Sequence, residues 1–389
     1  MASIKIPLMR STFFREAETR ERLAEFIRTS PRLSMGDQCK AFEKAFSVYQ
    51  ERKSSLLVSS GSAANLGLIQ ALLNLGRLQK GDRVGVSALT WATNVMPIMQ
   101  LGLIPVAIDC DRSHLNVTAA ELQKHIDSLK AVFLTNVLGF CGDIENIAAL
   151  CEKKKVILLE DNCESLGTRY QGKLLGNFGL ASTFSFFVGH HLSTIEGGMI
   201  CTDDQELASM LLMVRAHGWD RNLTPEEQQA LRTKHGLDDF HARYTFYEPA
   251  YNLRTTEISG FLGALQLPML EATIEKRAKN FTRFHAAALR HPDRYYALTS
   301  DHIERLSNFA MPLVTTSADI LRETVERFEE AGVEIRPIIA GDITTHPFWT
   351  KELPKTDCPN SRIIHSQGFY FANNPDLTDD EVTLMCGLL

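Results

Sequence analysis

The sequence predicts an α/β protein in which a large domain with a mixed, mostly parallel sheet is followed by a smaller α+β domain. Between Ser54 and Ile200, short runs rich in Val, Ile and Leu alternate with longer helical patterns, as in a doubly wound sheet. After about Ile274 this alternation gives way to a helical pattern and then to strands that flank a second helix. We therefore expect a large domain over residues 1–273 and a small domain over residues 274–389.

The strands expected in the large domain are short and apolar, which is typical of strands buried on both faces of a parallel sheet. They lie at residues 54–60, 82–88, 103–109, 130–139, 155–162, 180–187 and 197–204, and a helix at residues 62–75 follows the first. In the small domain we expect helices at residues 277–289 and 318–332 and strands at residues 307–316 and 332–339. The polar interval at residues 220–244 interrupts the large domain and predicts a surface excursion or a lid.

The composition indicates a globular protein without a polyanionic partner. Of the 389 residues, 44% are hydrophobic and 23% are charged, and the net charge is -6. Because Lys and Arg form no basic runs, we expect neither nucleic acid nor an anionic membrane surface as a partner. The sequence has no apolar window of about 18 residues and no apolar core of a signal peptide at its start, so we expect a cytoplasmic protein.

The eight cysteines are scattered, and no two of them form a C-x-x-C pair. Most lie in apolar or strand-like stretches, which favours buried free thiols in a reducing compartment over a metal or cluster site. We therefore predict no metal centre.

Three strand ends carry residues suited to a flat, phosphorylated cofactor. In SSGSAAN, residues 59–65, small residues run into a helix and would present backbone N–H groups to a phosphate, and Ser62 as an N-cap with Gly61 as a tight turn is the alternative that this segment alone favours. Asp161 ends an apolar strand, where it would keep a ring nitrogen protonated or would cap the next helix. Trp91 offers a stacking face or simple packing. Together these ends outline a pocket for pyridoxal phosphate (PLP).

Further along, the stretch SFFVGHHLSTIEGGMI, residues 185–200, combines the end of a strand with a turn and a Gly-Gly return. It holds two adjacent histidines and no lysine. With SSGSAAN, the Trp91 segment, LLEDNCES and YNLRTTEISG, this turn resembles the DegT-type sugar-nucleotide aminotransferases, which are PLP enzymes of the aspartate-aminotransferase fold (PLP fold type I). In that family the turn carries the lysine that binds PLP covalently, and His190 stands at the corresponding position here.

A histidine in place of this lysine also occurs in some branches of the family. GHHLSTIEGGM, RAHGWDRNL and STFF…SMG are similar to the deoxygenating branch that acts on GDP-4-keto-6-deoxymannose. A second histidine-containing branch, the CDP-sugar 3-dehydrases, carries an iron–sulfur cluster on four cysteines, three of them close together. Here Cys201 is followed next by Cys358, so we set that branch aside.

The resemblance implies a role for each matching residue. Gly61, Ser62 and Ser185 would hold the cofactor phosphate, Trp91 would stack on the ring, Asp161 would pair with the ring nitrogen, Glu164 would lie near the ring hydroxyl, Asn252 would reach the phosphate from the partner subunit of a homodimer, and His217 and Arg221 would line the sugar site. His191 is expected to support or pack.

The missing lysine predicts what the enzyme does. An imidazole with its ordinary pKa near 6.5 is a neutral base at pH 7, but it cannot hold the cofactor covalently. We expect His190 to move a proton at the cofactor C4′ atom while hydroxide leaves C3 of the sugar, which would give a 3-deoxy-4-keto sugar and ammonia. L-Glutamate would restore pyridoxamine phosphate (PMP). Two alternatives stay open: a sugar aminotransferase that works without the lysine, and an inactive homologue that binds PLP or a sugar nucleotide.

Overall fold

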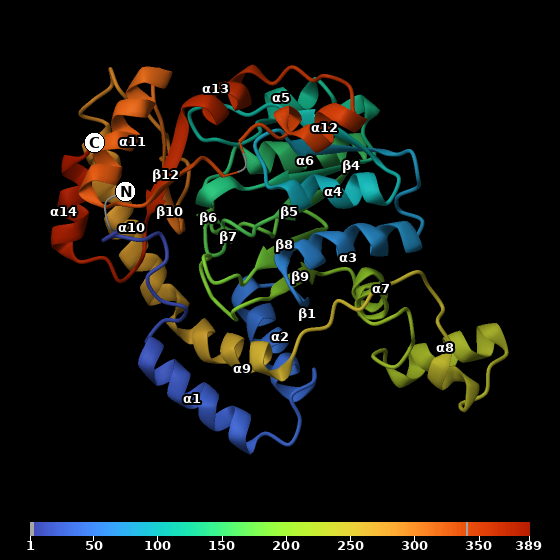
Figure 1. Ribbon diagram of the computed structural model, residues 1–389. Coiled ribbons are helices and arrows are strands. Elements are labelled where there is room, and N and C mark those ends of the chain that lie inside the picture. The colour runs from blue at the N-terminus through green and yellow to red at the C-terminus, as the bar shows by residue number, and fades with distance from the viewer. Residues whose placement is uncertain (1–3, 340) are drawn as a thin grey trace.

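The computed structural model describes residues 4–339 and 341–389 (Figure 1). Its centre is a seven-stranded sheet with the strand order β1-β9-β8-β5-β4-β2-β3, in which only β9 runs antiparallel to its neighbours. The strands are β1 Ser54–Val58, β2 Arg83–Ser87, β3 Ile104–Ile108, β4 Ala131–Thr135, β5 Ile157–Asp161, β8 Ala181–Ser185 and β9 Gly198–Thr202. Each strand expected in the large domain is present, and the mixed, mostly parallel sheet is confirmed.

Helices cover both faces of this sheet. In β1, Leu56 and Val58 belong to one apolar cluster, whereas Leu57 belongs to another, as the alternation of side chains along a strand requires. The helices of this part are α1 Glu16–Thr29, α2 Asp37–Gln50, α3 Gly61–Asn74, α4 Ala92–Gln100, α5 Ala119–Gln123, α6 Ile144–Lys154, α7 Gln205–Arg215 and α9 Glu257–Gln266. A two-stranded ribbon of β6 Arg169–Tyr170 and β7 Lys173–Leu174 follows β5. Because helices cover both faces of the sheet, the polar groups at the ends of the strands are the candidates for a binding site.

The C-terminal part contains a second, three-stranded antiparallel sheet with the order β10-β12-β11. Its elements are α10 Leu270–Ala288, β10 Ala310–Val314, α11 Ala318–Ala331, β11 Ile335–Pro337, β12 Gly368–Ala372 and α14 Asp379–Gly387. The two helices and two strands expected here are present, and β12 is an additional central strand. Helix α10 is continuous across the predicted domain boundary at residues 273 and 274, so the division at that point stays a prediction.

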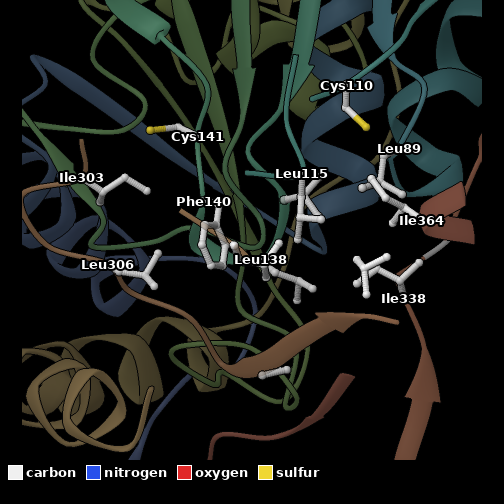
Figure 2. Packing of buried hydrophobic residues seen from close by; sticks show 14 of the residues in the cluster. Leu89, Cys110, Leu115, Leu138, Phe140, Cys141, Ile303, Leu306, Ile338 and Ile364 are labelled. Atoms are coloured by element: carbon white, nitrogen blue, oxygen red, sulfur yellow. The ribbon is translucent and has the colours of Figure 1, made fainter. Parts of the chain in front are cut away.

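The two sheets share one apolar core. Figure 2 shows Leu138 and Phe140, which follow β4, gathered with Ile303 and Leu306 from the segment before β10, and all four belong to the same buried cluster. Within residues 341–367, α12 Pro347–Glu352 and α13 Pro359–Gln367 follow a short 3₁₀ turn. At the start of α13, the Asp109 carboxylate at the end of β3 accepts hydrogen bonds from two backbone N–H groups at 2.9 Å. Part of the predicted small domain therefore packs on the large sheet.

The interval at residues 220–244 is a surface excursion, as predicted. It contains α8 Pro225–His235, which has no buried residue and lies away from the body of the molecule in Figure 1. A capping box at Thr224 starts this helix. The excursion is fixed at its base, because Arg232 Nε donates to the carboxylate of the fully buried Asp220 at 2.8 Å.

Two features bear on the expectations about membranes and thiols. Within residues 4–339 and 341–389, no helix has the length and apolar character needed to cross a membrane. All eight cysteines are free, and six of them are buried. Burial raises the pKa of thiols such as Cys141 and Cys201 to about 12, so these groups are inert and neutral at pH 7. The prediction of free thiols is confirmed, and most of them are buried.

Candidate active site

The Ser60–Ser62 segment leads from β1 into α3, and it lies against the end of β8. A Cβ atom at Gly61 would come within 2.8 Å of the Ser185 Cβ atom and within 2.9 Å of Cys163 Sγ, so only glycine fits there. Ser60 caps the helix, because its Oγ accepts from the Ala63 N–H at 3.0 Å; the alternative that Ser62 is the N-cap is therefore wrong. Gly61 is required by this close approach, and it is the first residue of α3, so the tight-turn alternative is also wrong.

Ser62 has a different contact. Its hydroxyl donates to Thr93 Oγ1 at 3.1 Å and so connects the start of α3 to the start of α4. The structure thus brings Gly61, Ser62 and Ser185 together at one edge of the sheet, with hydroxyl groups beside the first turn of a helix. Such a helix N-terminus with small residues is suited to a phosphate.

Asp161 ends β5 and is only 3% exposed. Its Oδ2 atom accepts from Asn65 Nδ2 at 2.8 Å and from Asn94 Nδ2 at 3.4 Å, and its Oδ1 atom accepts from the Cys163 N–H at 3.1 Å. No helix begins directly after Asp161, because residues 163–167 form turns, so the alternative of a helix cap is wrong. Among the described residues, neutral amide and N–H donors hold this carboxylate and no ion pair engages it, so it is able to pair with a cationic group of a ligand.

Trp91 follows β2 and Glu164 follows β5, and β4 lies between these two strands in the sheet. Trp91 precedes α4 and is 54% exposed, which fits a stacking face better than a packing role. Glu164 is buried, and its Oε2 atom accepts from the Leu138 N–H at 2.9 Å. Burial raises the pKa of Glu164 to about 8, with a further increase from Asp161. At pH 7 its carboxyl group is therefore mostly protonated and can donate a hydrogen bond.

His190 follows β8 in the turn that the sequence singles out. Its N–H donates to the Phe187 carbonyl at 2.9 Å, and its imidazole stacks on the Phe309 ring, with centroids 5.0 Å apart and planes at 20°. Burial lowers the pKa of His190 to about 4, the Arg277 charge adds to this effect, and the Ser185 backbone opposes it. The ordinary value near 6.5 assumed from the sequence is thus too high. The imidazole is neutral at pH 7, as proton abstraction requires, but it is a weaker base than expected.

His191 has the supporting position expected of it. It is fully buried, its Nε2 atom lies 3.1 Å from the Ser307 carbonyl, and its ring meets Phe309 edge-on. Burial also holds the pKa of His191 well below its usual range. These contacts tie the turn to the C-terminal part of the chain.

The remaining predicted residues form a separate group near the excursion. Arg254 joins two of them, because its Nε atom donates to Asn252 Oδ1 at 2.9 Å and its Nη2 atom lies 3.4 Å from His217 Nε2. The Arg221 guanidinium lies 4.1 Å from the centre of the Trp219 ring. Among the described residues, no hydrogen bond, ion pair or ring contact joins these side chains to Gly61, Asp161 or Ser185. The backbone of this group nevertheless reaches the end of β1, because the Ser59 N–H donates to the Leu253 carbonyl at 2.9 Å.

Sequence reasoning missed several residues of the site. Asn65 and Asn94 hold Asp161 in place, and each is a polar residue on the buried side of an otherwise apolar helix, which is a readable signal. Phe309 and Arg277 gave no such signal, because they reach His190 from distant parts of the chain.

This fold and this arrangement of strand ends define a class of protein. Residues 15–389 match the DegT/DnrJ/EryC1/StrS aminotransferase family, and the chain belongs to that family. It is 39% identical to a GDP-4-keto-6-deoxy-D-mannose 3-dehydratase of Yersinia pseudotuberculosis, over 95% of this chain and 94% of that protein. It is 34% identical to the enzyme of the same name from Escherichia coli O55:H7, over 97% of this chain and 98% of the relative.

Solved structures agree with this relationship. An E. coli GDP-4-keto-6-deoxy-D-mannose 3-dehydratase with bound hydrated PLP matches all of both chains, with a TM-score of 0.89 and 32% identity. A structure of a GDP-4-keto-6-deoxymannose 3-dehydratase with a trapped PLP-glutamate geminal diamine has the same TM-score and covers 99% of this chain and 100% of its own. The aspartate-aminotransferase-like fold (PLP fold type I) expected from the resemblance is confirmed.

Proposed function

We propose that the chain is a PLP- and PMP-dependent 3-dehydratase that removes the C3 hydroxyl group of GDP-4-keto-6-deoxymannose and uses L-glutamate as the amino donor. The observation that carries this proposal is the neutral, largely buried His190 at the turn where aminotransferases of the family have a lysine. The two relatives that bear the name of this activity match nearly the whole chain, which supports the substrate.

The residues at the strand ends fit the cofactor. We assign the phosphate to the cradle of Gly61, Ser62 and Ser185, where a Cβ atom at position 61 would fill the available space. Asp161, held by two side-chain amides, would pair with the ring nitrogen. The exposed face of Trp91 would stack on the ring, and the protonated Glu164 would donate to the ring hydroxyl oxygen.

The chain supplies the proton transfers of the proposed reaction. When bound, the cofactor would carry the amino group from glutamate, and its ring would accept the electron pair left when C4′ loses a proton and would release it as hydroxide leaves C3 of the sugar. Neutral His190 accepts a proton at the cofactor C4′ atom and can return it, and the Phe309 ring fixes the plane in which it does so. Asp161 favours the protonated ring nitrogen throughout, because an opposite charge nearby stabilises a cation.

We further propose a homodimer with shared sites. Asn252 would contact the phosphate, and His217 and Arg221 would line the sugar site, all from the partner subunit. The resemblance to the family supports this arrangement; within one chain, the Asn252 and His217 side chains contact Arg254, and the Arg221 guanidinium contacts the Trp219 ring. The eight free cysteines favour a reducing compartment such as the cytoplasm.

Product analysis tests the proposal. The protein is incubated with GDP-4-keto-6-deoxymannose, PLP and L-glutamate, and the products are followed by NMR. A 3-deoxy-4-keto sugar with a new methylene signal at C3 is expected. A stable 4-amino sugar would instead assign the chain to the aminotransferases, and an unchanged sugar would favour an inactive binding protein.

A further inference from the structure

A buried cation lies directly behind the histidine turn. Arg277 lies in α10 and is only 5% exposed. Its Nη2 atom donates to the His190 carbonyl at 3.4 Å, and its Nη1 atom donates to the His191 carbonyl at 3.3 Å. One guanidinium therefore donates hydrogen bonds to the carbonyl groups of two consecutive residues of the turn.

The guanidinium is itself fixed from the other side. Its Nε atom donates to the Asn373 carbonyl at 3.2 Å, just after β12, and Asn373 Nδ2 donates back to the Arg277 carbonyl at 3.0 Å. Asn373 is fully buried and also donates to Asn308 Oδ1 at 2.9 Å. Through these hydrogen bonds, Arg277 of α10 connects the His190–His191 turn to the segment that follows β12 of the second sheet.

Arg277 is unusual for a buried arginine because no acidic partner compensates it. Among residues 4–339 and 341–389, no carboxylate forms an ion pair with its guanidinium, and Asp376 acts on it only at longer range. Desolvating a charge is costly unless hydrogen bonds replace the lost water, and here main-chain carbonyls do so. Three carbonyls in different directions match the planar fork of arginine, whereas a lysine ammonium could not reach all of them with the same geometry.

We propose that Arg277 is a positioning residue for the dehydration step: its guanidinium sets the main-chain conformation of the His190–His191 turn and so aims the His190 imidazole at the cofactor. This inference rests on the proposed function for the step that it serves. A structural role alone would require only that the carbonyls be satisfied. A positioning role also requires that the placement and the charge beside His190 affect the proton transfer.

The electrostatics around His190 agree with this role. Among the described residues, the Arg277 guanidinium is the charged group that acts on His190, and the adjacent His191 is neutral at pH 7. Burial is the main cause of the lowered pKa of His190, and the positive charge of Arg277 lowers it further because it disfavours a protonated imidazole. The same residue thus places the base and helps to keep it neutral.

Two substitutions separate placement from charge. Arg277→Lys keeps the charge and loses the fork, whereas Arg277→Gln loses the charge and keeps some hydrogen bonding. Arg283→Lys and Arg283→Gln are matched controls on the same helix, where Arg283 makes an exposed ion pair with Asp379 at 2.8 Å. We expect both Arg277 variants to lower kcat by about 10- to 100-fold, the usual cost of a small misplacement, with little change in KM for the sugar nucleotide. The Arg283 variants should keep the wild-type values.

The titration of His190 supplies a readout that does not depend on turnover. Histidine ring signals of the cofactor-bound protein are followed by NMR against pH, and His190 is assigned by comparison with His190→Asn. We expect His190 to titrate well below 6.5 in the wild type and in Arg277→Lys, and at higher pH in Arg277→Gln. Unchanged kcat in Arg277→Lys, or a His190 titration in Arg277→Gln that equals the wild type, would overturn the proposal.

The proposal can be tested even if the Arg277 variants do not fold. If neither Arg277 variant folds, a wild-type His190 pKa at or above 6.5 still overturns the proposal, because it contradicts both the burial of the imidazole and the smaller lowering assigned to Arg277. If the wild type shows no dehydration at all, the proposed function fails, whereas the titrations of the wild type and Arg277→Gln still test whether Arg277 acts on His190.

Discussion

The His190 imidazole lies nearly parallel to the Phe309 ring, with 5.0 Å between the two centroids and 20° between the planes. Phe309 directly precedes β10 of the second sheet, whereas His190 follows β8 of the first. The orientation of the proposed base is therefore set by packing between two parts of the chain that are more than a hundred residues apart in sequence. Stacking of this kind fixes the plane of the imidazole.

Removal of the stacking face should impair catalysis more than folding. Phe309→Leu keeps an apolar side chain of similar volume and loses the flat surface. Aromatic pairs contribute about 0.5–1.5 kcal/mol beyond simple burial, so we expect kcat to fall by about 2- to 10-fold. Steady-state kinetics check the fall, and circular dichroism checks that the fold is kept. Loss of secondary structure with normal specific activity of the remaining folded protein would contradict this role.

The cofactor should be bound without a covalent bond to the chain. Because the turn at residues 185–200 contains no lysine, borohydride treatment of the isolated protein should leave no pyridoxyl group on any peptide. In His190→Lys the same treatment should attach the cofactor at position 190, and dehydration should fall sharply because an amine can now expel the product. Peptide mass spectrometry checks both results. A pyridoxyl-lysine peptide from the wild-type protein would contradict the role given to His190.

Asp161→Asn separates the electronic role of the carboxylate from cofactor binding. The substitution removes the charge opposite the ring nitrogen and nearly preserves shape, including the amide contacts from Asn65 and Asn94. We expect both half-reactions, with glutamate and with the sugar nucleotide, to slow by more than about 10-fold, whereas the affinity for PLP falls less. Stopped-flow absorbance of each half-reaction measures this. Normal rates in both would reduce Asp161 to a structural residue.

Stability should fall as the pH drops below the pKa of an unfolded histidine. Burial lowers the pKa of His190 to about 4 and that of His191 well below its usual value. Between about pH 6.5 and pH 4 the unfolded chain therefore binds protons at these positions that the folded chain does not. Each such proton changes the free energy of unfolding by about 1.4 kcal/mol per pH unit. Urea denaturation of the wild type and of His190→Gln should diverge in this interval, and parallel curves would contradict the burial of a neutral His190.

Features that depend on local sequence patterns could be predicted, whereas features that depend on contacts between distant segments could not. Apolar runs and strand ends are local patterns, so the strands of the large sheet and the candidates Asp161 and Trp91 could be predicted. The helix cap is Ser60 and not Ser62, and a local pattern does not distinguish them because both are small hydroxyl residues beside one glycine. Strand β12 and the contacts of Arg277 and Phe309 depend on chain segments far apart in sequence, and nothing in either segment alone reveals them.

The amounts of the nitrogen-containing products and the incorporation of deuterium distinguish the proposed reaction from its two alternatives. Each sugar that loses its C3 hydroxyl group should release one ammonia, and each cycle should consume one glutamate, so ammonia, 2-oxoglutarate and 3-deoxy-4-keto sugar should appear in equal amounts. An aminotransferase would give 2-oxoglutarate and an amino sugar without ammonia, and an inactive homologue would give none of these products. In deuterium oxide the product should carry one deuterium at C3, because that carbon takes a proton from solvent after hydroxide leaves. Enzymatic assays for ammonia and 2-oxoglutarate, together with NMR of the sugar, measure every term. If 2-oxoglutarate accumulates while ammonia stays at background, then a histidine in place of the lysine does not direct this enzyme to dehydration.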